Sequence, residues 1–276
     1  MTIRQLAYKL RQQNIWNAIK IIANIFIYVF LRTISKEKST EKLLLKKVGI
    51  RCKIDGHKIR YNFELLTFLN NFETQEYLDI ILDKKYWTFI DIWSNIWRLS
   101  WISIVYAWKE DKTVVLCDPN PYVFNVSKTF YEKEIHKNNH TYFLNHAISN
   151  TKTELPFFMV KWDVLNGIGS LDEKNILGGK TEKIIVKSIT FTNIIEKMHV
   201  ANDNVLVKID VEWHEQNVLQ SVIDYLAKNS KISKVDLLVE IWEKNSHEIH
   251  NFLKKTWHLK EFKKISINDY FIVLQK

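Results

Sequence analysis

The stretch FIDIWSNIWRLS, residues 89–100, decides the fold. It begins like the end of a buried parallel strand and continues like a turn that opens a helix. Such a turn usually needs small residues, because the backbone bends sharply and comes close to a ligand. This turn instead carries two tryptophans, Trp93 and Trp97. The stretch predicts the first strand and turn of an α/β domain, and it raises the question of why indoles stand there.

Strands and helices alternate along the chain after this stretch. Strands are predicted at residues 113–118, 141–148, 205–211 and 234–241, helices at 98–107, 121–135, 215–228 and 246–256, and closing strands at 259–265 and 269–275. This alternation favours a mostly parallel sheet with helices on both faces. In such sheets a ligand binds at the carboxyl ends of the strands, near the point where strand order reverses. The residues that follow the strands are therefore the site candidates.

The residues before this series predict a separate segment. Residues 1–47 read as a basic, apolar helical segment with a charged linker, and residues 48–276 as the main domain, which opens with a hairpin around Asp55-Gly56. The apolar run from Ile25 to Leu31 is shorter than the ~20 residues that a spanning helix needs. The segment is either a helix packed on the domain or a helix lying on an anionic membrane.

Composition is consistent with a folded globular chain, since 46% of the residues are hydrophobic and 26% are charged. The net charge of +9 comes from scattered lysines, which the base composition of an AT-rich gene explains ahead of an anionic partner. The two cysteines are far apart and form no metal signature. One imbalance is unusual: the chain has 6 glycines and 10 tryptophans. An α/β domain with many tight turns should not manage on so little glycine.

Five motifs in register carry a resemblance to a known family. FIDIWSNIWRLS, VLCDPNP, LNHAIS, VLVKIDVEWHEQNVL and LLVEIW resemble successive motifs of the FkbM family of S-adenosylmethionine-dependent methyltransferases. The resemblance spans roughly residues 48–260. It implies a Rossmann-like, seven-stranded, mostly parallel sheet of the class I methyltransferase type, with helices on both faces and the last strand antiparallel.

Tryptophans replace glycines where the sequence departs from the family. Trp93, Trp97 and Trp213 stand at motif glycines, and Trp257 stands just past a predicted helix, where glycine is favoured. We hypothesise that UGA codons, which some bacteria read as glycine, have been translated as tryptophan. The alternative is that these are genuine core tryptophans.

The resemblance implies a set of residues for S-adenosylmethionine. Asp118 would accept the ribose hydroxyls, as acids do at this point in nucleotide-binding sheets. The turn residues after the first strand would hold the amino-acid end of the cofactor, and the residues after the third strand would contact its adenine. These cofactor candidates are Asp91, Trp93, Asn95, Trp97, Asp118, Asn145 and Ala147. A surface acid that caps the next helix is the alternative for Asp118, and ordinary turn chemistry the alternative for Asn95.

Acidic residues after the fourth strand face the predicted acceptor site. An acceptor hydroxyl is a poor nucleophile at neutral pH, so a neighbouring base should help. Asp210 or Glu212 is the predicted base or orienting carboxylate, with His214 next. Glu215 is as readily a first-turn acid of the following helix. Ser170, in a glycine-containing loop that reads as a lid, and Glu240 are predicted acceptor contacts, and no metal site is expected.

The leading prediction is an O-methyltransferase for a hydroxyl of a sugar or polysaccharide, acting in the cytoplasm or at the inner face of the membrane. The alternative is a non-catalytic binding module whose cofactor loop is blocked by real tryptophans. A nicotinamide oxidoreductase is disfavoured, because residues 91–97 have the wrong spacing for G-x-G-x-x-G even with glycine at each tryptophan. No basic and aromatic stripe suggests nucleic acid.

Overall fold

A computed structural model describes the chain over the following residues: 50–54, 57–61, 80, 83, 85–94, 112–121, 123–125, 128, 140–160, 169–175, 181–198, 200, 204–228, 231–266 and 268–276. The chain divides into two units, residues 1–72 and 73–276. In the first unit, β1 (Ile50–Ile54) pairs antiparallel with β2 (His57–Tyr61), and Ile54 lies opposite His57. This pairing is the predicted hairpin. The N-terminal helical segment lies outside the described residues.

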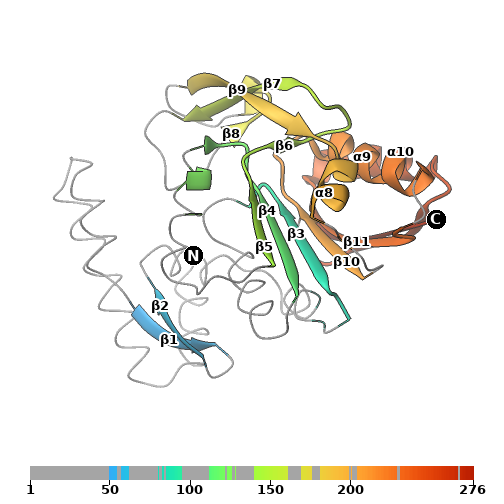
Figure 1. The fold of residues 1–276 in the computed structure, drawn as a ribbon. Helices are drawn as coiled ribbons and strands as arrows, with labels where there is room; N and C mark the ends of the chain where they lie inside the picture. The colour runs from blue at the N-terminus through green and yellow to red at the C-terminus, as the bar shows by residue number, and fades with distance from the viewer. Residues whose placement is uncertain are drawn as a thin grey trace, which may run out of the picture. The chain divides into compact units, whose positions relative to one another are not determined.

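The second unit is built on a seven-stranded sheet in the order β12-β13-β11-β10-β3-β4-β5 (Figure 1). Its strands are β3 (Thr88–Ile92), β4 (Thr113–Cys117), β5 (Thr141–Leu144), β10 (Val205–Ile209), β11 (Lys234–Glu240), β12 (Leu259–Lys264) and β13 (Asp269–Gln275). β13 runs antiparallel to both of its neighbours, and the other neighbouring pairs are parallel. The predicted fold class, with its antiparallel last strand, is confirmed.

Burial explains why these segments form strands. Every residue of β3 and of β10 is buried, and the interior of β11 is buried as well. Continuous apolar runs of this kind suit central strands of a parallel sheet that is covered on both faces. The chain proceeds from β3 outward to β5 and then returns to place β10 on the other side of β3. The strand order therefore reverses between β3 and β10, which is where a ligand is expected.

Three described helices pack beside this sheet. α8 (Phe191–Lys197) begins with a capping box between Thr190 and Asn193. α9 (Glu215–Lys228) matches its predicted range, and α10 (Glu243–Lys254) begins three residues before its predicted start at residue 246. Phe191 packs edge-on against Tyr225 of α9, with ring centroids 5.5 Å apart. No helix among the described residues is long and apolar enough to cross a membrane.

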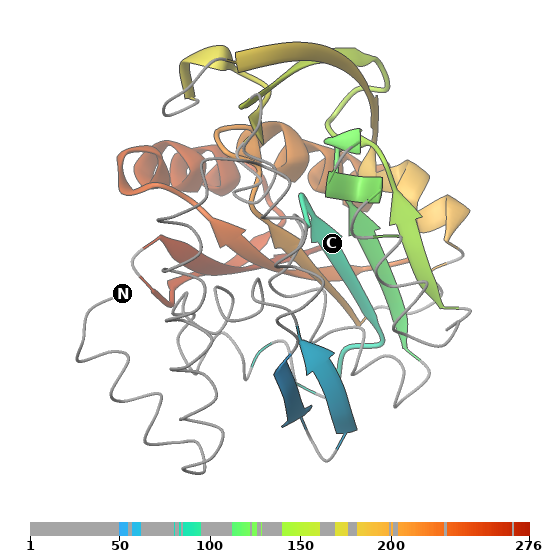
Figure 2. The same cartoon turned by 90° about the vertical axis from the view of Figure 1, so that its left-hand side faces the viewer.

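A second, four-stranded sheet was not predicted. Its strand order is β6-β9-β7-β8, with β6 (Ala147–Ile148), β7 (Glu154–Val160), β8 (Gly169–Ser170) and β9 (Thr181–Ile189). Figure 2 shows it above the carboxyl ends of β3, β4 and β5, and we call it the roof sheet. The single-turn 3-10 helix η1 (Glu173–Asn175) follows β8. The predicted loop over residues 161–180 therefore contains a strand, although residues 161–168 and 176–180 lie outside the described ranges.

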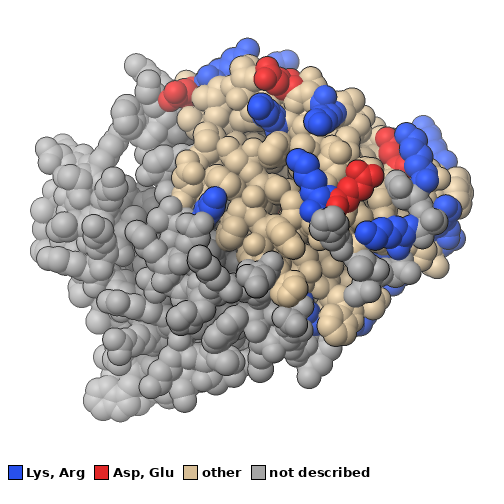
Figure 3. Space-filling view, viewed as in Figure 1, with Lys and Arg blue, Asp and Glu red and all other residues tan. Residues whose placement is uncertain are grey.

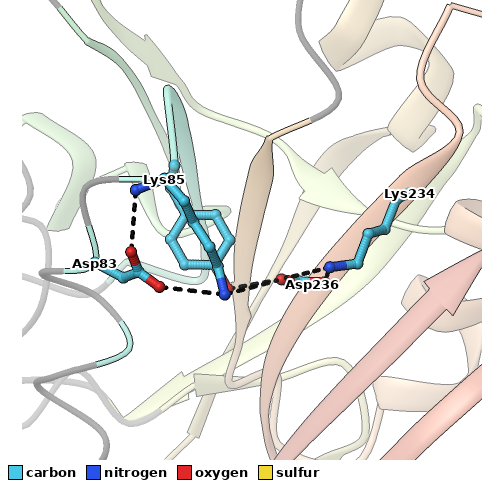
Figure 4. A network of polar contacts seen from close by, with 5 residues as sticks. Asp83, Lys85, Lys234 and Asp236 are labelled. Carbon is cyan, nitrogen blue, oxygen red and sulfur yellow. Dashed lines mark hydrogen bonds and ion pairs between the residues drawn. The ribbon is translucent and has the colours of Figure 1, made fainter.

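A polar network anchors the amino end of the seven-stranded sheet (Figure 4). The Tyr86 hydroxyl donates to buried Asp236 at 2.7 Å, and Lys234 lies 3.0 Å from the same carboxylate. Lys85 connects Asp236 to Asp83, at N–O distances of 3.8 and 3.2 Å. Burial and the Asp236 hydrogen bond raise the pKa of Tyr86. This network links the segment before β3 to β11, at the end of the strands opposite to the candidate site.

Candidate functional site

The turn after β3 has a backbone conformation that tryptophan rarely adopts. Trp93 has φ 69°, which for a bulky side chain is a genuine outlier. Its backbone N–H and that of Ser94 both donate to the Cys117 carbonyl, at 2.8 and 2.9 Å, so the turn is fixed to the end of β4. The indole is buried against Phe157 of the roof sheet, with ring centroids 5.3 Å apart. Asn95 and Trp97 lie outside the described residues.

Asp118 and Asn145 lie at the carboxyl ends of β4 and β5. Asp118 is buried, and its Oδ1 accepts the Asn120 N–H at 2.9 Å, just before the helical residue Pro121. Asn145 Nδ2 donates to the carbonyls of Asp118 and Pro119, at 2.9 and 3.2 Å. Because the Cys117 carbonyl accepts both N–H groups of the Trp93 turn, the next residue, Asp118, lies directly beside that turn. Ala147 is buried in β6, opposite Ser188 of β9.

A buried lysine joins two carboxylates at the reversal point. Lys208 Nζ lies 2.9 Å from Asp210 Oδ2 and 3.9 Å from Asp91 Oδ1. Lys208 and Asp91 are opposite each other on adjacent parallel strands, and both are buried. The Asp210 N–H reaches the Ile92 carbonyl of β3 at 3.4 Å. A buried charge is tolerated when it is paired in this way.

Two glutamates face this ion pair, and both have raised pKa values. The charge of Asp210 and then burial raise the pKa of Glu240 to about 8. Burial and then Asp210 raise the pKa of Glu212, against a hydrogen bond from the Trp242 side chain. The raised pKa favours the protonated form of Glu240 beside an ion-paired aspartate. The structure brings these predicted acceptor-side residues together.

The turn after β10 contains two further residues in the left-handed region. Glu212 has φ 43° and Trp213 has φ 77°. The turn is held from one side by Glu215 Oε1, which accepts the Trp213 N–H at 2.9 Å, and from the other by Ser170, whose hydroxyl donates to the Glu212 carbonyl at 3.3 Å. Glu215 is buried, and burial raises its pKa to about 7. Glu215 thus braces the turn as the first residue of α9.

The His214 ring lies between Ser149, which follows β6 of the roof sheet, and Asn217 of α9. Asn217 Nδ2 lies 3.1 Å from His214 Nδ1, which must then accept, so the ring proton is on Nε2 and is shared with Ser149 Oγ at 3.2 Å. Burial lowers the pKa of His214 to about 4, so the ring is neutral at physiological pH. Sequence reasoning missed Ser149 and Phe157, which connect the roof sheet to this edge; the only sequence signal was their position after the third predicted strand.

The five described tryptophans fall into two groups. Trp93 and Trp213 have positive φ, and Trp87, Trp242 and Trp257 are 47%, 42% and 66% exposed. None of the five is a core indole on ordinary backbone. The expectation of a glycine conformation at Trp257 is wrong, because α10 ends at Lys255 in a right-handed conformation and Trp257 has no positive φ. Trp213 stacks parallel to Trp242 at 6.4 Å, beneath the Lys244 ammonium.

Comparisons with known proteins give low similarities. No protein-family model matches the sequence, and no curated protein matches it. The methyltransferase FkbM from Methylobacillus flagellatus KT is similar at a TM-score of 0.44 and 9% identity, over 69% of this chain and 44% of that one. The SAM-dependent methyltransferase from Agrobacterium tumefaciens has a TM-score of 0.40 and 8% identity, over 82% and 70% of the two chains. M. jannaschii TYW2 in complex with AdoMet has a TM-score of 0.38 and 12% identity, over 82% of this chain and 83% of that one.

This chain therefore spans less than half the length of the first of these structures. At such scores the fold assignment rests on the strand order and register of the seven-stranded sheet itself.

Proposed function

We propose that the protein is an S-adenosylmethionine-dependent methyltransferase that methylates a hydroxyl of a sugar or polysaccharide. One observation carries the proposal: the buried acid Asp118, the Trp93 turn and the Lys208 ion pairs lie at the carboxyl ends of the three neighbouring strands β4, β3 and β10, where the strand order reverses. A nucleoside cofactor binds at this point in open α/β sheets. The sugar class of the acceptor comes from the FkbM resemblance alone.

The backbone at the site fits the cofactor, but one side chain does not. A φ of 69° at position 93 is the conformation that glycine adopts without cost, and it lets the backbone approach a ligand closely. The buried indole of Trp93 fills that space instead. With a small residue there, the turn would hold the amino-acid end, Asp118 the ribose, and Asn145 and Ala147 the adenine. The bound cofactor supplies an electrophilic methyl group.

We infer that positions 93 and 213 are glycine in the cell. Both tryptophans adopt left-handed backbone, where a side chain other than glycine costs about 1–2 kcal/mol. The three other described tryptophans are exposed, so an indole there fills no core. Reading of UGA as glycine in the source organism accounts for both groups, and the codons test the inference. UGG at positions 93 and 213 would contradict it, as would a mass spectrum of the native protein with tryptophan at those sites.

The acceptor side would be formed by Asp210, Glu212 and Glu240. Asp210 is ion-paired with Lys208 at 2.9 Å, and the raised pKa of Glu240 favours its protonated form. One carboxylate and one carboxylic acid can together hold a hydroxyl, the first accepting its proton and the second donating to its oxygen. Asp210 is therefore our choice of base, with Glu212 next. His214 orients the turn through Ser149 and Asn217.

Calorimetric titration of S-adenosylmethionine tests the cofactor assignment. Three forms of the chain are compared: the printed sequence, the Trp93→Gly/Trp97→Gly/Trp213→Gly variant, and that variant with Asp118→Ala. Binding is expected in the glycine variant, and it should be weakened at least about tenfold by loss of Asp118. A folded glycine variant that does not bind the cofactor would overturn the proposal.

A non-catalytic binding module is the second candidate. The contact between the Trp93 and Phe157 rings favours it, because a genuine indole there closes the cofactor space. The codon at position 93 separates the two candidates before any protein is made. If it is UGG, the stacked and half-exposed pair of Trp213 and Trp242 becomes the first surface to test for ligands.

A further inference from the structure

The outer face of the roof sheet combines lysines with exposed apolar side chains. Alternation along β9 turns Val186 inward and leaves Lys183, Ile185 and Lys187 exposed. Their partners on β7, which share this face, are Phe158, Pro156 and Glu154. The Lys183 ammonium lies 5.7 Å from the Phe158 ring centre, which confirms that these side chains project to the same side. We call these six residues the outer face.

Ile185 is the least expected residue on this face. It is 59% exposed, and apart from tryptophans it is the one large hydrophobic residue so exposed among the residues that the structure describes. Single exposed apolar residues are normal on soluble proteins. Here, however, Pro156 lies directly opposite Ile185, and Phe158 lies one pair further along the strands. The apolar side chains form a strip across the two strands.

Lys183 and Lys187 flank the strip on β9, and Glu154 lies directly opposite Lys187 on β7. Lys152, Lys187 and Lys197 all act on His146, whose pKa is lowered by burial and then by these three charges. Within the described ranges no ion pair involves these lysines or Lys183. Figure 3 shows both basic and acidic side chains on the surface at β7 and β9. With two lysines and one glutamate, the outer face has a net charge of +1 beside its apolar side chains.

We propose that the outer face docks the protein onto an anionic lipid bilayer. Ammonium groups attract the phosphates of acidic headgroups, while neighbouring apolar side chains enter the interface. Nucleic acid is disfavoured, because the face offers lysine without arginine and only one half-buried aromatic ring for stacking. Docking would hold the carboxyl edge of the seven-stranded sheet close to the membrane, where a lipid-linked acceptor would be presented.

Vesicle flotation with the full chain tests this docking. The lipids are phosphatidylcholine alone, and phosphatidylcholine mixed with an equal amount of phosphatidylglycerol. The Lys183→Glu/Lys187→Glu variant should bind the anionic vesicles at least about tenfold more weakly, because each lysine near such a surface contributes a several-fold factor. Ile185→Ser should weaken binding several-fold while leaving the charge unchanged. The matched control is Lys254→Glu/Lys260→Glu, which reverses two exposed lysines on α10 and β12 and should bind as the parent does.

Two outcomes would overturn the proposal. If Lys183→Glu/Lys187→Glu binds anionic vesicles as the parent does, another surface, such as the basic segment before residue 48, carries the binding. If the parent binds duplex DNA through these lysines and does not float with vesicles, the face serves nucleic acid. Unchanged thermal unfolding of the variants shows that a loss of binding is not a loss of fold. The test does not involve S-adenosylmethionine, so its result is separate from that of the proposed function.

Discussion

The rings of Trp93 and Phe157 pack against each other at the candidate site, with ring centroids 5.3 Å apart and ring planes tilted by 54°. One ring comes from the turn after β3 and the other from the roof sheet. Two polar contacts reinforce this packing, from Ser170 to the Glu212 carbonyl and from Ser149 to His214. The roof sheet is therefore fastened to both turns that contain a tryptophan with positive φ. Any cofactor that binds here would lie beneath it.

The φ of 77° at Trp213 predicts which of two small residues is the more stable replacement at this position. Trp213→Gly should be more stable than Trp213→Ala by about 1 kcal/mol, because only glycine adopts left-handed backbone without strain. At Trp257, which has no positive φ, the Trp257→Ala variant should be at least as stable as the Trp257→Gly variant. Free energies of unfolding from denaturant titrations of the four variants measure this. Alanine more stable than glycine at position 213 would remove the structural support for a glycine there.

Gly169 is required by the space that Phe157 occupies. A Cβ at this position would lie only 2.2 Å from Cζ of the Phe157 ring, which is held in place by the Trp93 contact. Gly169→Ala should therefore destabilise the protein by about 1–3 kcal/mol through overpacking. The same substitution in a Phe157→Leu background should cost less, because the smaller side chain leaves room. Equal costs in the two backgrounds, measured by denaturant unfolding, would refute the clash.

Local patterns were enough to predict the central sheet. Continuous apolar runs identified β3, β10 and β11, and the periodicity of α9 gave its range residue for residue. The unusual backbone at Trp93 and Trp213 was also foreseeable, because a strand that turns directly into a helix needs a residue that tolerates the bend. Trp257 shows the limit of this reasoning. A helix can end without a left-handed residue, and α10 does so.

The roof sheet could not be predicted in the same way. β6 and β8 are two residues long, and β9 reads TEKIIVKSI, with charged and apolar residues in no regular alternation. These strands exist through pairing with distant segments, which no local period reports. The same holds for His214, whose partner Ser149 lies 65 positions away. Its chemical type suggested a base, but its contact with the roof sheet could not be read from the sequence.

Lys208 neutralises a site that is otherwise acidic, so its removal should be costly. Lys208→Met leaves Asp91 buried without the ammonium at 3.9 Å and Asp210 without the one at 2.9 Å. Loss of one partner of a buried pair typically costs about 3–5 kcal/mol. Lys208→Met/Asp91→Asn should cost less than Lys208→Met alone, because a neutral amide replaces the uncompensated charge. Unfolding free energies of the two variants check this, and a double variant less stable than the single would show that Asp91 is stabilised by other groups.

Glu240 should make the protein less stable as the pH rises. The carboxyl has a pKa of about 8 in the folded chain against 4.5 as its ordinary value, because Asp210 and burial disfavour its charge. Between these values the native state binds a proton that the unfolded state has released, so the free energy of unfolding falls as the pH increases from about 4.5 to about 8. Glu240→Gln should remove this contribution, and its stability relative to the parent should grow across the window by at least about 1 kcal/mol.

Glu248→Gln, an exposed substitution on α10, is the matched control and should follow the parent. Urea unfolding at a series of pH values gives the comparison. If Glu240→Gln and the parent keep a constant difference from pH 5 to pH 8, then Glu240 is ionised in the native state, and it cannot donate a hydrogen bond to an acceptor.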